Sequence, residues 1–173
     1  MRRIAVGCVL LGALAASGCG YHLAGRGDLI PKTVLTIAVQ PFGNATPRYK
    51  LARLLPSDIS RELISRTRYK LVDDPNQADA VLSGALTNFS AYPIIYDNVT
   101  NRATTVQAVV VLQVKLVNRA DGKVIYEKMG AEFRERYEIS IDPAAYFDES
   151  GTAMERLSKD VARSVVSALL NAF

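Results

Sequence analysis

The sequence predicts an α+β domain in which two helices pack on one face of a four-stranded, mainly antiparallel sheet. Apolar and polar residues alternate from Val110 to Leu116, as in a half-buried strand, and Asp121-Gly122 then supplies a hairpin turn. Two other segments carry an apolar residue at every fourth position, which is typical of amphipathic helices. These residues are Leu51, Leu55, Ile59 and Leu63 in the first segment, and Ala153, Leu157, Val161, Val165 and Leu169 in the second. The order strand, helix, strands, helix indicates one layer of helices on one sheet.

The chain begins with a pattern typical of a secretory signal peptide over residues 1–18. Arg2 and Arg3 precede an apolar run from Ile4 to Ala16, which is shorter than the roughly 20 residues that a transmembrane helix needs. Small residues followed by Cys19 resemble a bacterial lipobox, in which the cysteine is lipidated and becomes the first residue. The alternative is ordinary secretion with a free N-terminus. Several acyl chains on Cys19 would anchor the protein stably to its bilayer.

The residue after the lipobox cysteine is Gly20. In lipoproteins of bacteria with two membranes, aspartate at this position favours retention in the inner membrane. Its absence predicts the inner leaflet of the outer membrane, with the domain facing the periplasm. Residues 19–32 then form a lipidated lead-in, and residues 33–173 form a single α+β domain.

Composition is that of an ordinary globular protein, with 49% hydrophobic and 22% charged residues. Half of the formal net charge of +4 leaves with Arg2 and Arg3, so the basic balance gives little support for a nucleic-acid partner. Cys8 also leaves with the signal peptide. The mature chain therefore cannot form an intramolecular disulfide.

A first strand is expected over residues 33–40, followed by a helix that runs to about Thr67. Thr46 is expected to cap this helix and Pro47 to occupy its first position. Pro56 would cost about 3 kcal/mol inside the helix. Because the apolar stripe keeps its phase across Pro56, one kinked helix is predicted, and a helix that begins at Pro56 is the alternative.

Three further strand segments are expected before the last helix. Residues 69–72 form a short strand, and residues 80–90 a longer one in which Gly84 indicates a bulge or close packing. Pro93 ends or kinks this strand, and residues 94–96 can resume it. Residues 104–118 and 124–139 form the hairpin around Gly122. The last helix opens at Thr152, after a loop over residues 142–151.

The second hairpin strand is expected to have one buried and one solvated face. The buried face would hold Ile125, Met129, Ala131, Phe133, Tyr137 and Ile139, with Glu127 interrupting the series. The solvated face would hold Lys128, Glu132, Arg134 and Arg136.

No catalytic constellation is apparent in the sequence. His22 is the only histidine, so neither a catalytic triad nor a histidine metal cluster can be built. Nucleophile elbows and Walker loops are absent from the sequence. Asp73 and Asp74 fit a turn better than a cation site. We therefore expect a protein that is not an enzyme and that has no cofactor and no metal.

Several segments in order resemble the LPS-assembly lipoprotein family, the LptE family. They are Cys-Gly-Tyr-His-Leu at 19–23, Val-Gln-Pro-Phe-Gly-Asn at 39–44, Arg-Tyr-Lys-Leu-Val at 68–72 and Ala-Asp-Ala-Val-Leu-Ser-Gly at 78–84. A long valine-rich strand, the turn at Gly122 and a closing amphipathic helix complete the order. The resemblance spans nearly the whole mature chain.

The resemblance implies an outer-membrane lipoprotein that sits in the lumen of a large β-barrel partner, LptD. Such a protein acts as plug and assembly factor, and it helps to insert lipopolysaccharide into the outer leaflet. Lipopolysaccharide binding through basic residues near one end of the domain is also implied, and Arg102 is the best match. No basic residue occurs between Asp142 and Glu155, so Arg134 and Arg136 are the candidate substitutes. The alternative is a periplasm-facing lipoprotein of a secretion channel or envelope scaffold, which would form homo-oligomers.

Overall fold

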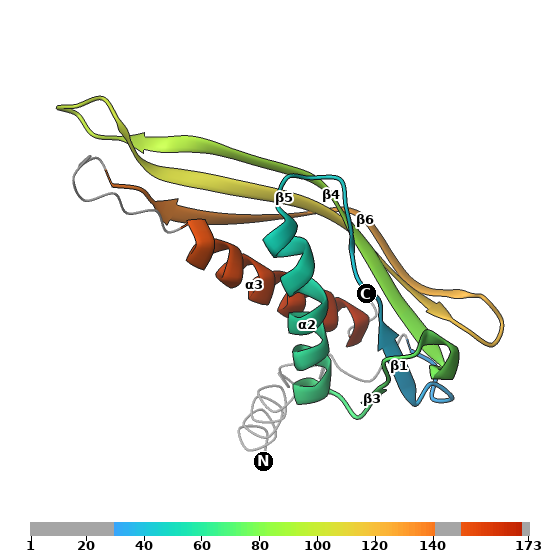
Figure 1. The fold of residues 1–173 in the computed structure, drawn as a ribbon. Coiled ribbons are helices and arrows are strands. Elements are labelled where there is room, and N and C mark those ends of the chain that lie inside the picture. Colours follow the sequence, from blue (N-terminus) through green and yellow to red (C-terminus); the bar gives the residue numbers. More distant parts are fainter. Residues whose placement is uncertain (1–29, 141–149, 171–173) are drawn as a thin grey trace, which may run out of the picture.

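A computed structural model describes residues 30–140 and 150–170 of the chain (Figure 1). The signal peptide, Cys19 and the loop at 141–149 lie outside the described residues. The strands form one six-stranded sheet in the order β3-β1-β4-β5-β6, and β2 pairs with β4. Their bounds are β1 Thr36–Val39, β2 Gly43–Asn44, β3 Lys70–Leu71, β4 Ala80–Tyr96, β5 Ala103–Asn118 and β6 Val124–Glu138. The helices are α2, Tyr49–Arg66, α3, Ser150–Leu170, and the short 3₁₀ helix η1, Pro75–Gln77.

The α+β class is confirmed, but the prediction of four mainly antiparallel strands was wrong. The sheet is mixed, because β1 runs parallel to both β3 and β4 and β2 runs parallel to β4. Only β4, β5 and β6 form an antiparallel meander. The parallel part arises because α2 carries the chain back to the starting end of β1, as helical crossovers do. The two-residue strands β2 and β3 are too short to produce a periodic pattern in the sequence.

Helix α2 runs unbroken through Pro56, which confirms the prediction of a single helix. Its apolar stripe explains why the proline is tolerated. Leu51, Leu55, Ile59 and Leu63 are all fully buried, and each contributes about 1.5–3 kcal/mol. Together they outweigh a proline cost of about 3 kcal/mol.

The predicted start of α2 was wrong by two residues. Arg48, and not Thr46, occupies the capping position, and no side chain caps the helix. The Thr46 hydroxyl instead accepts a hydrogen bond from the Arg48 N–H at 3.2 Å. Asn44 Oδ1 in turn accepts from the Thr46 N–H at 2.9 Å. These bonds use the polar side chains to shape the loop before the helix.

Both helices lie on the same side of the sheet, as predicted (Figure 1). Helix α3 begins at Ser150, two residues before the predicted Thr152, and it packs against α2 and β6. The contact between the helices includes a polar bond, in which the buried Ser158 hydroxyl donates to Asp58 Oδ2 at 2.6 Å. Within residues 30–140 and 150–170, neither helix is apolar enough over the length needed to cross a bilayer.

Strand β4 is longer than predicted, because it continues through Pro93 to Tyr96. Pro93 is tolerated because β1 and β2 pair with β4 only up to Leu86, so β4 is an edge strand at this point. The register between β4 and β5 also shifts just after Pro93. At Gly84 the close-packing alternative is correct: an added Cβ would lie 2.6 Å from the Phe42 ring.

The faces of β6 were predicted correctly from Ala131 onward and at Ile125, which is partly buried against the core. Leu112 pairs with Ala131 and Val114 with Lys128, so Met129 and Gly130 together oppose one residue of β5. Gly130 has φ of +67°, which suits a bulge of this kind. The bulge reverses the alternation before it, so Met129, predicted to be buried, is 65% exposed. Lys128 pairs with the buried Val114 and so lies on the opposite face from Met129, yet it is exposed, as predicted.

Candidate functional site

The candidate site lies on the open face of the β4–β5–β6 meander, away from the helices. On β6, Arg136 pairs with Gln107 of β5, and Arg134 pairs with Val109 of β5. Tyr92 on β4 also pairs with Gln107. Since directly opposed residues point to the same face of a sheet, Tyr92, Gln107, Val109, Arg134 and Arg136 share one surface. We call these five residues the open-face site.

Two residues form the floor of the open-face site. Gln107 and Val109 are 8% and 9% exposed, although neither α2 nor α3 covers this face. Gln107 Nε2 donates to the Tyr92 hydroxyl at 2.9 Å, which fixes the ring over the centre of the meander. The hydrogen bond thus preorganises the floor of the site, and Arg134 and Arg136 lie beside the floor on β6.

The two arginines differ in how they are held. Arg134 Nε donates to Glu132 Oε1 at 2.6 Å. This hydrogen bond and the charge of Glu132 raise the pKa of Arg134 above its usual value. Within the described parts of the chain, the Arg136 guanidinium has no hydrogen bond or ion pair. Its backbone carbonyl accepts from Arg156 Nη2 at 3.3 Å, which ties this part of β6 to α3. Arg136 is therefore the arginine more available to an anionic ligand.

Arg102 lies in the turn between β4 and β5, at the tip of the projecting hairpin (Figure 1). Asp97 organises this turn: its Oδ1 accepts from the N–H groups of Val99 and Thr100 at 3.1 and 2.7 Å. The Thr100 hydroxyl also donates to it, at 2.7 Å. The bonds from Thr100 and Val99 lower the pKa of Asp97. The Asp97 N–H donates to the Arg102 carbonyl at 2.8 Å, so the turn fixes the backbone of Arg102.

The sequence reasoning missed a set of exposed apolar side chains near this tip. Tyr92 is 43% exposed, Tyr96 51%, Ile95 53% and Val99 92%. The apolar run directly after Pro93 could have indicated this exposed apolar set. From the sequence, that segment was expected only to end or to continue a strand. Together with Arg102, these residues form what we call the apolar tip.

The structure brings Arg134 and Arg136 together but keeps Arg102 apart from them. The two β6 arginines are neighbours on one face, two positions apart. Arg102 precedes Gln107, the partner of Arg136, by five residues, which corresponds to about 16 Å along a strand. All three arginines nevertheless lie in the part of the meander nearer to the turn between β4 and β5. Cys19, the predicted lipidation site, lies outside the described residues.

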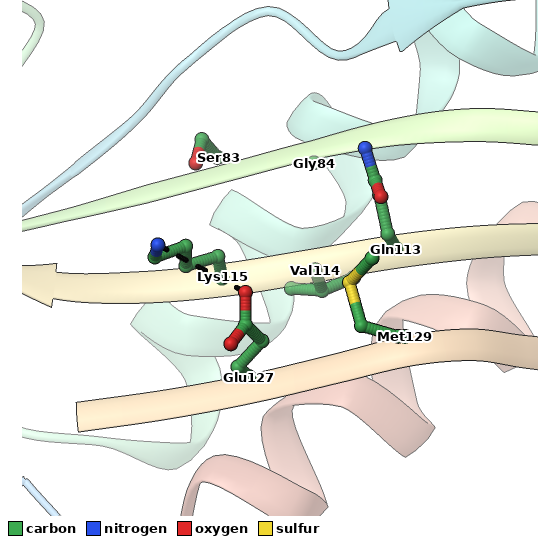
Figure 2. Close-up of a pocket in the computed structure, with 7 residues that line it drawn as sticks. All are labelled: Ser83, Gly84, Gln113, Val114, Lys115, Glu127 and Met129. Carbon is green, nitrogen blue, oxygen red and sulfur yellow. Dashed lines mark ion pairs between the residues drawn. The ribbon is translucent and has the colours of Figure 1, made fainter. Parts of the chain in front are cut away.

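A shallow hollow occurs nearer the middle of the open face (Figure 2). Figure 2 shows Lys115 and Glu127 pointing toward each other, and their Nζ and Oε1 atoms are 3.9 Å apart. Met129, turned outward by the bulge, lies beside Gln113 at the other end. Opposite charges thus pair across the hollow, and among the described hydrogen bonds none joins the Ser83 hydroxyl to Lys115 or Glu127. Over the described residues, no cluster of three metal-binding side chains occurs.

Solved structures with the same fold include bacterial lipoproteins. Lipoprotein B of Nitrosomonas europaea superposes with a TM-score of 0.56 at 14% identity, covering 87% of this chain and 90% of that one. The PelC dodecamer of Paraburkholderia phytofirmans superposes with a TM-score of 0.52 at 17% identity, covering 81% and 90%. At such identities the likeness establishes the fold alone. Among curated proteins, none matches the chain.

The sequence match is more informative than the structural likeness. The family model named LptE and described as lipopolysaccharide-assembly matches residues 34–169. This range takes in every strand and helix described above except the last residue of α3. It confirms the family identified from the short motifs. The chain therefore belongs to the LptE family of lipopolysaccharide-assembly proteins.

Proposed function

We propose that this lipopolysaccharide-assembly protein is anchored by lipid on Cys19 to the inner leaflet of the outer membrane. The domain faces the periplasm and acts as plug and assembly factor of a large LptD-like β-barrel. Lipopolysaccharide binds at the open-face site and the apolar tip. The observation that supports this function best is the presence of arginines beside exposed apolar side chains on the projecting hairpin.

The chemistry of these surfaces suits lipid A, which combines phosphate groups with acyl chains. A guanidinium offers a planar fork of donors that can bind a phosphate through two hydrogen bonds. Arg136 and Arg102 supply this group at two levels of the hairpin. Tyr96, Ile95 and Val99 supply apolar surface for acyl chains near Arg102. The open face also carries polar residues suited to the polar lumen of a barrel.

The alternative is a homo-oligomeric component of a secretion channel or envelope scaffold. The fold shared with the PelC dodecamer favours this alternative. It predicts assemblies of the chain with itself and no affinity for lipopolysaccharide. Family membership favours the assembly function instead.

Charge reversal on the hairpin tests the proposed ligand site. We expect Arg136→Glu and Arg102→Glu each to weaken lipopolysaccharide binding by roughly tenfold to a hundredfold, as loss of a charged hydrogen bond predicts. The melting temperature should change little for Arg136→Glu, because the Arg136 guanidinium forms no hydrogen bond or ion pair with the residues that the structure describes. Lys159→Glu, an exposed change on α3, is the matched control. Unchanged binding in both hairpin variants would remove these arginines from the site.

A further inference from the structure

A surface hollow of about 480 Å³ lies between the first half of α2 and the segment that leads from β1 to this helix (Figure 1). That volume is within the range of ligand pockets in proteins. Pro41 is exposed at the hollow and Tyr49 is 76% exposed, so apolar surface there is open to solvent. The lining is mainly apolar and includes Val39, Pro41, Phe42, Asn44, Tyr49, Ala52 and Pro56. We call this hollow the α2 groove.

Asn44 places an unpaired hydrogen-bond donor at the α2 groove. Its Oδ1 accepts from the N–H and the hydroxyl of Thr46, at 2.9 and 2.7 Å, which fixes the orientation of the amide. The Nδ2 group is buried and has no hydrogen-bond partner among the described residues. Such a donor is unusual in folded proteins, because a buried polar group is costly without a partner. It therefore favours a bound group that supplies an acceptor.

Pro56 removes the usual donor of a helical carbonyl at the same groove. The Ala52 carbonyl would ordinarily accept from the N–H four positions on, and Pro56 has no N–H. Ala52 and Pro56 both line the groove. A donor and an acceptor in an otherwise apolar hollow match a peptide group flanked by apolar side chains. The α2 groove therefore suits an extended, uncharged peptide segment.

The lead-in before the domain contains a segment with the matching chemistry. Residues 20–25 hold no Asp, Glu, Lys or Arg, and their large apolar side chains are Tyr21 and Leu23. Because these two residues are two positions apart, both side chains point to the same side of an extended segment. Residues 20–25 thus offer the groove two apolar side chains together with peptide N–H and carbonyl groups.

The lead-in is also long enough to reach the α2 groove. The Val34 N–H donates to the Pro31 carbonyl at 2.9 Å, so the described chain begins within one turn of Val34. From Val34 along β1 to Pro41, an extended chain covers about 24 Å. Tyr21 lies nine positions before Ile30, and an extended segment of that length spans about 30 Å. Tyr21 can therefore lie in the groove.

We propose that residues 20–25 of the lead-in dock in the α2 groove, with Tyr21 and Leu23 on its apolar lining. In this arrangement Asn44 Nδ2 donates to a lead-in carbonyl, and the Ala52 carbonyl accepts from a lead-in N–H. The docking depends on neither the barrel nor lipopolysaccharide. It shortens the connection between Cys19 and the domain, so the position of the groove decides where the lipid leaves the domain.

That position lies at the root of the projecting hairpin. Asn44 in β2 pairs with Leu86, and beyond Leu86 none of the described strands pairs with β4 on that side. Cys19 lies two positions before Tyr21, a separation of at most about 7 Å. A lipid on Cys19 would start beside the hairpin, so that one bilayer holds the lipid and the barrel that receives the hairpin. This consequence rests on the proposed anchoring and barrel, whereas the docking itself does not.

Crosslinking tests the docking in the purified, lipidated full-length protein in detergent. Ala24→Cys combined with Tyr49→Cys places one thiol on the lead-in and one at the rim of the groove. Ala24→Cys with Leu35→Cys is the matched control, because Leu35 is 63% exposed and lies closer to the lead-in along the chain. With a short bifunctional maleimide, we expect the 24–49 link to form several-fold faster than the 24–35 link. Mass spectrometry of the linked peptides measures both rates.

Two changes in the lead-in decide whether the apolar side chains hold it in the groove. Tyr21→Ser with Leu23→Ser should lower the rate of the 24–49 link to that of the 24–35 link, whereas Arg26→Ser should leave it unchanged. Equal rates for the two links, or a 24–49 rate that survives the double serine change, overturns the docking. A 49-linked peptide from a second copy also overturns it. An intact mass without acyl chains on Cys19 overturns the anchoring alone.

Discussion

At the residue scale, one carboxylate holds the parallel and antiparallel parts of the sheet together. Asp79 Oδ2 accepts from the N–H groups of Leu35 and Thr36, at 2.8 and 2.9 Å, and from the Thr36 hydroxyl at 2.9 Å. The Asp79 N–H donates back to the Thr36 hydroxyl oxygen at 2.9 Å. These bonds, with help from Arg119, lower the pKa of Asp79. Asp79 thus fastens the start of β1 to the start of β4.

The lowered pKa gives Asp79 a defined effect on stability. A carboxyl group with a lower pKa in the folded state stabilises the protein above its unfolded pKa of about 3.9. That stability is lost as the pH falls through the folded pKa. We expect Asp79→Ala to lower the melting temperature at pH 7 and the difference from wild type to shrink at about pH 3. Thermal unfolding followed by circular dichroism measures both.

The matched control for this prediction is Asp160→Ala, which removes an exposed carboxylate paired with Arg163. It should change the melting temperature little, because exposed ion pairs contribute about 0–1 kcal/mol. A melting temperature for Asp79→Ala equal to that of wild type at neutral pH would refute the role of this carboxylate.

A second residue-scale prediction concerns the turn that presents Arg102. Asp97→Ala removes the acceptor of three hydrogen bonds within the turn. We expect lipopolysaccharide binding to fall several-fold with little change in global stability, because the turn lies outside the core. Isothermal titration alongside thermal unfolding separates the two effects. Binding at the wild-type level would show that the order of the turn does not matter to the ligand.

At the element scale, the sequence predicted the structures with strong periodicity and missed those set by single contacts. Helix α2, the β5–β6 hairpin and the turn at Gly122 followed from repeating patterns over many residues. Strand β2 has two residues, so only its contact with β4 defines it. The bulge at Gly130 left a signal in the interruption at Glu127, but the sequence alone did not place the extra residue. Parallel pairing of β1 depends on the path of the chain, which periodicity does not encode.

The candidate site follows the same division. The solvated face of β6 was predictable from Arg134 and Arg136 because alternation is regular beyond Ala131. The contribution of Tyr92 and Gln107 was not predictable, because their hydrogen bond joins two residues that lie 15 positions apart on different strands. The apolar tip also escaped prediction, since apolar residues after Pro93 are equally consistent with a buried strand.

Packing of the segment before α2 on the sheet gives an element-scale prediction. A Cβ at Gly84 would lie 2.6 Å from the Phe42 ring and 2.8 Å from the Gln113 carbonyl oxygen. We expect Gly84→Ala to lower the free energy of unfolding by about 1–3 kcal/mol, the usual range for overpacking. Urea denaturation measures this change.

Gly122→Ala is the comparison, because nothing lies within 4 Å of the added Cβ and only its φ of +68° causes strain. It should lower the free energy of unfolding by about 1 kcal/mol. A Gly84→Ala protein as stable as wild type would mean that Phe42 does not pack as described.

At the scale of the whole molecule, the fold separates two tasks along its length. The helices and the base of the sheet form the core, and the hairpin projects beyond the helices (Figure 1). A long two-faced hairpin leaves one face free for a partner while the other face stays bound to the core. This arrangement suits a plug that inserts its hairpin into a partner.

The most direct test of the proposed function is recovery of the tagged full-length lipoprotein from outer membranes, followed by mass spectrometry of what accompanies it. We predict one large outer-membrane β-barrel protein in equal molar amount. Recovery of the chain only as an assembly of its own copies would contradict the plug function. That result would instead support the secretion-channel or scaffold alternative.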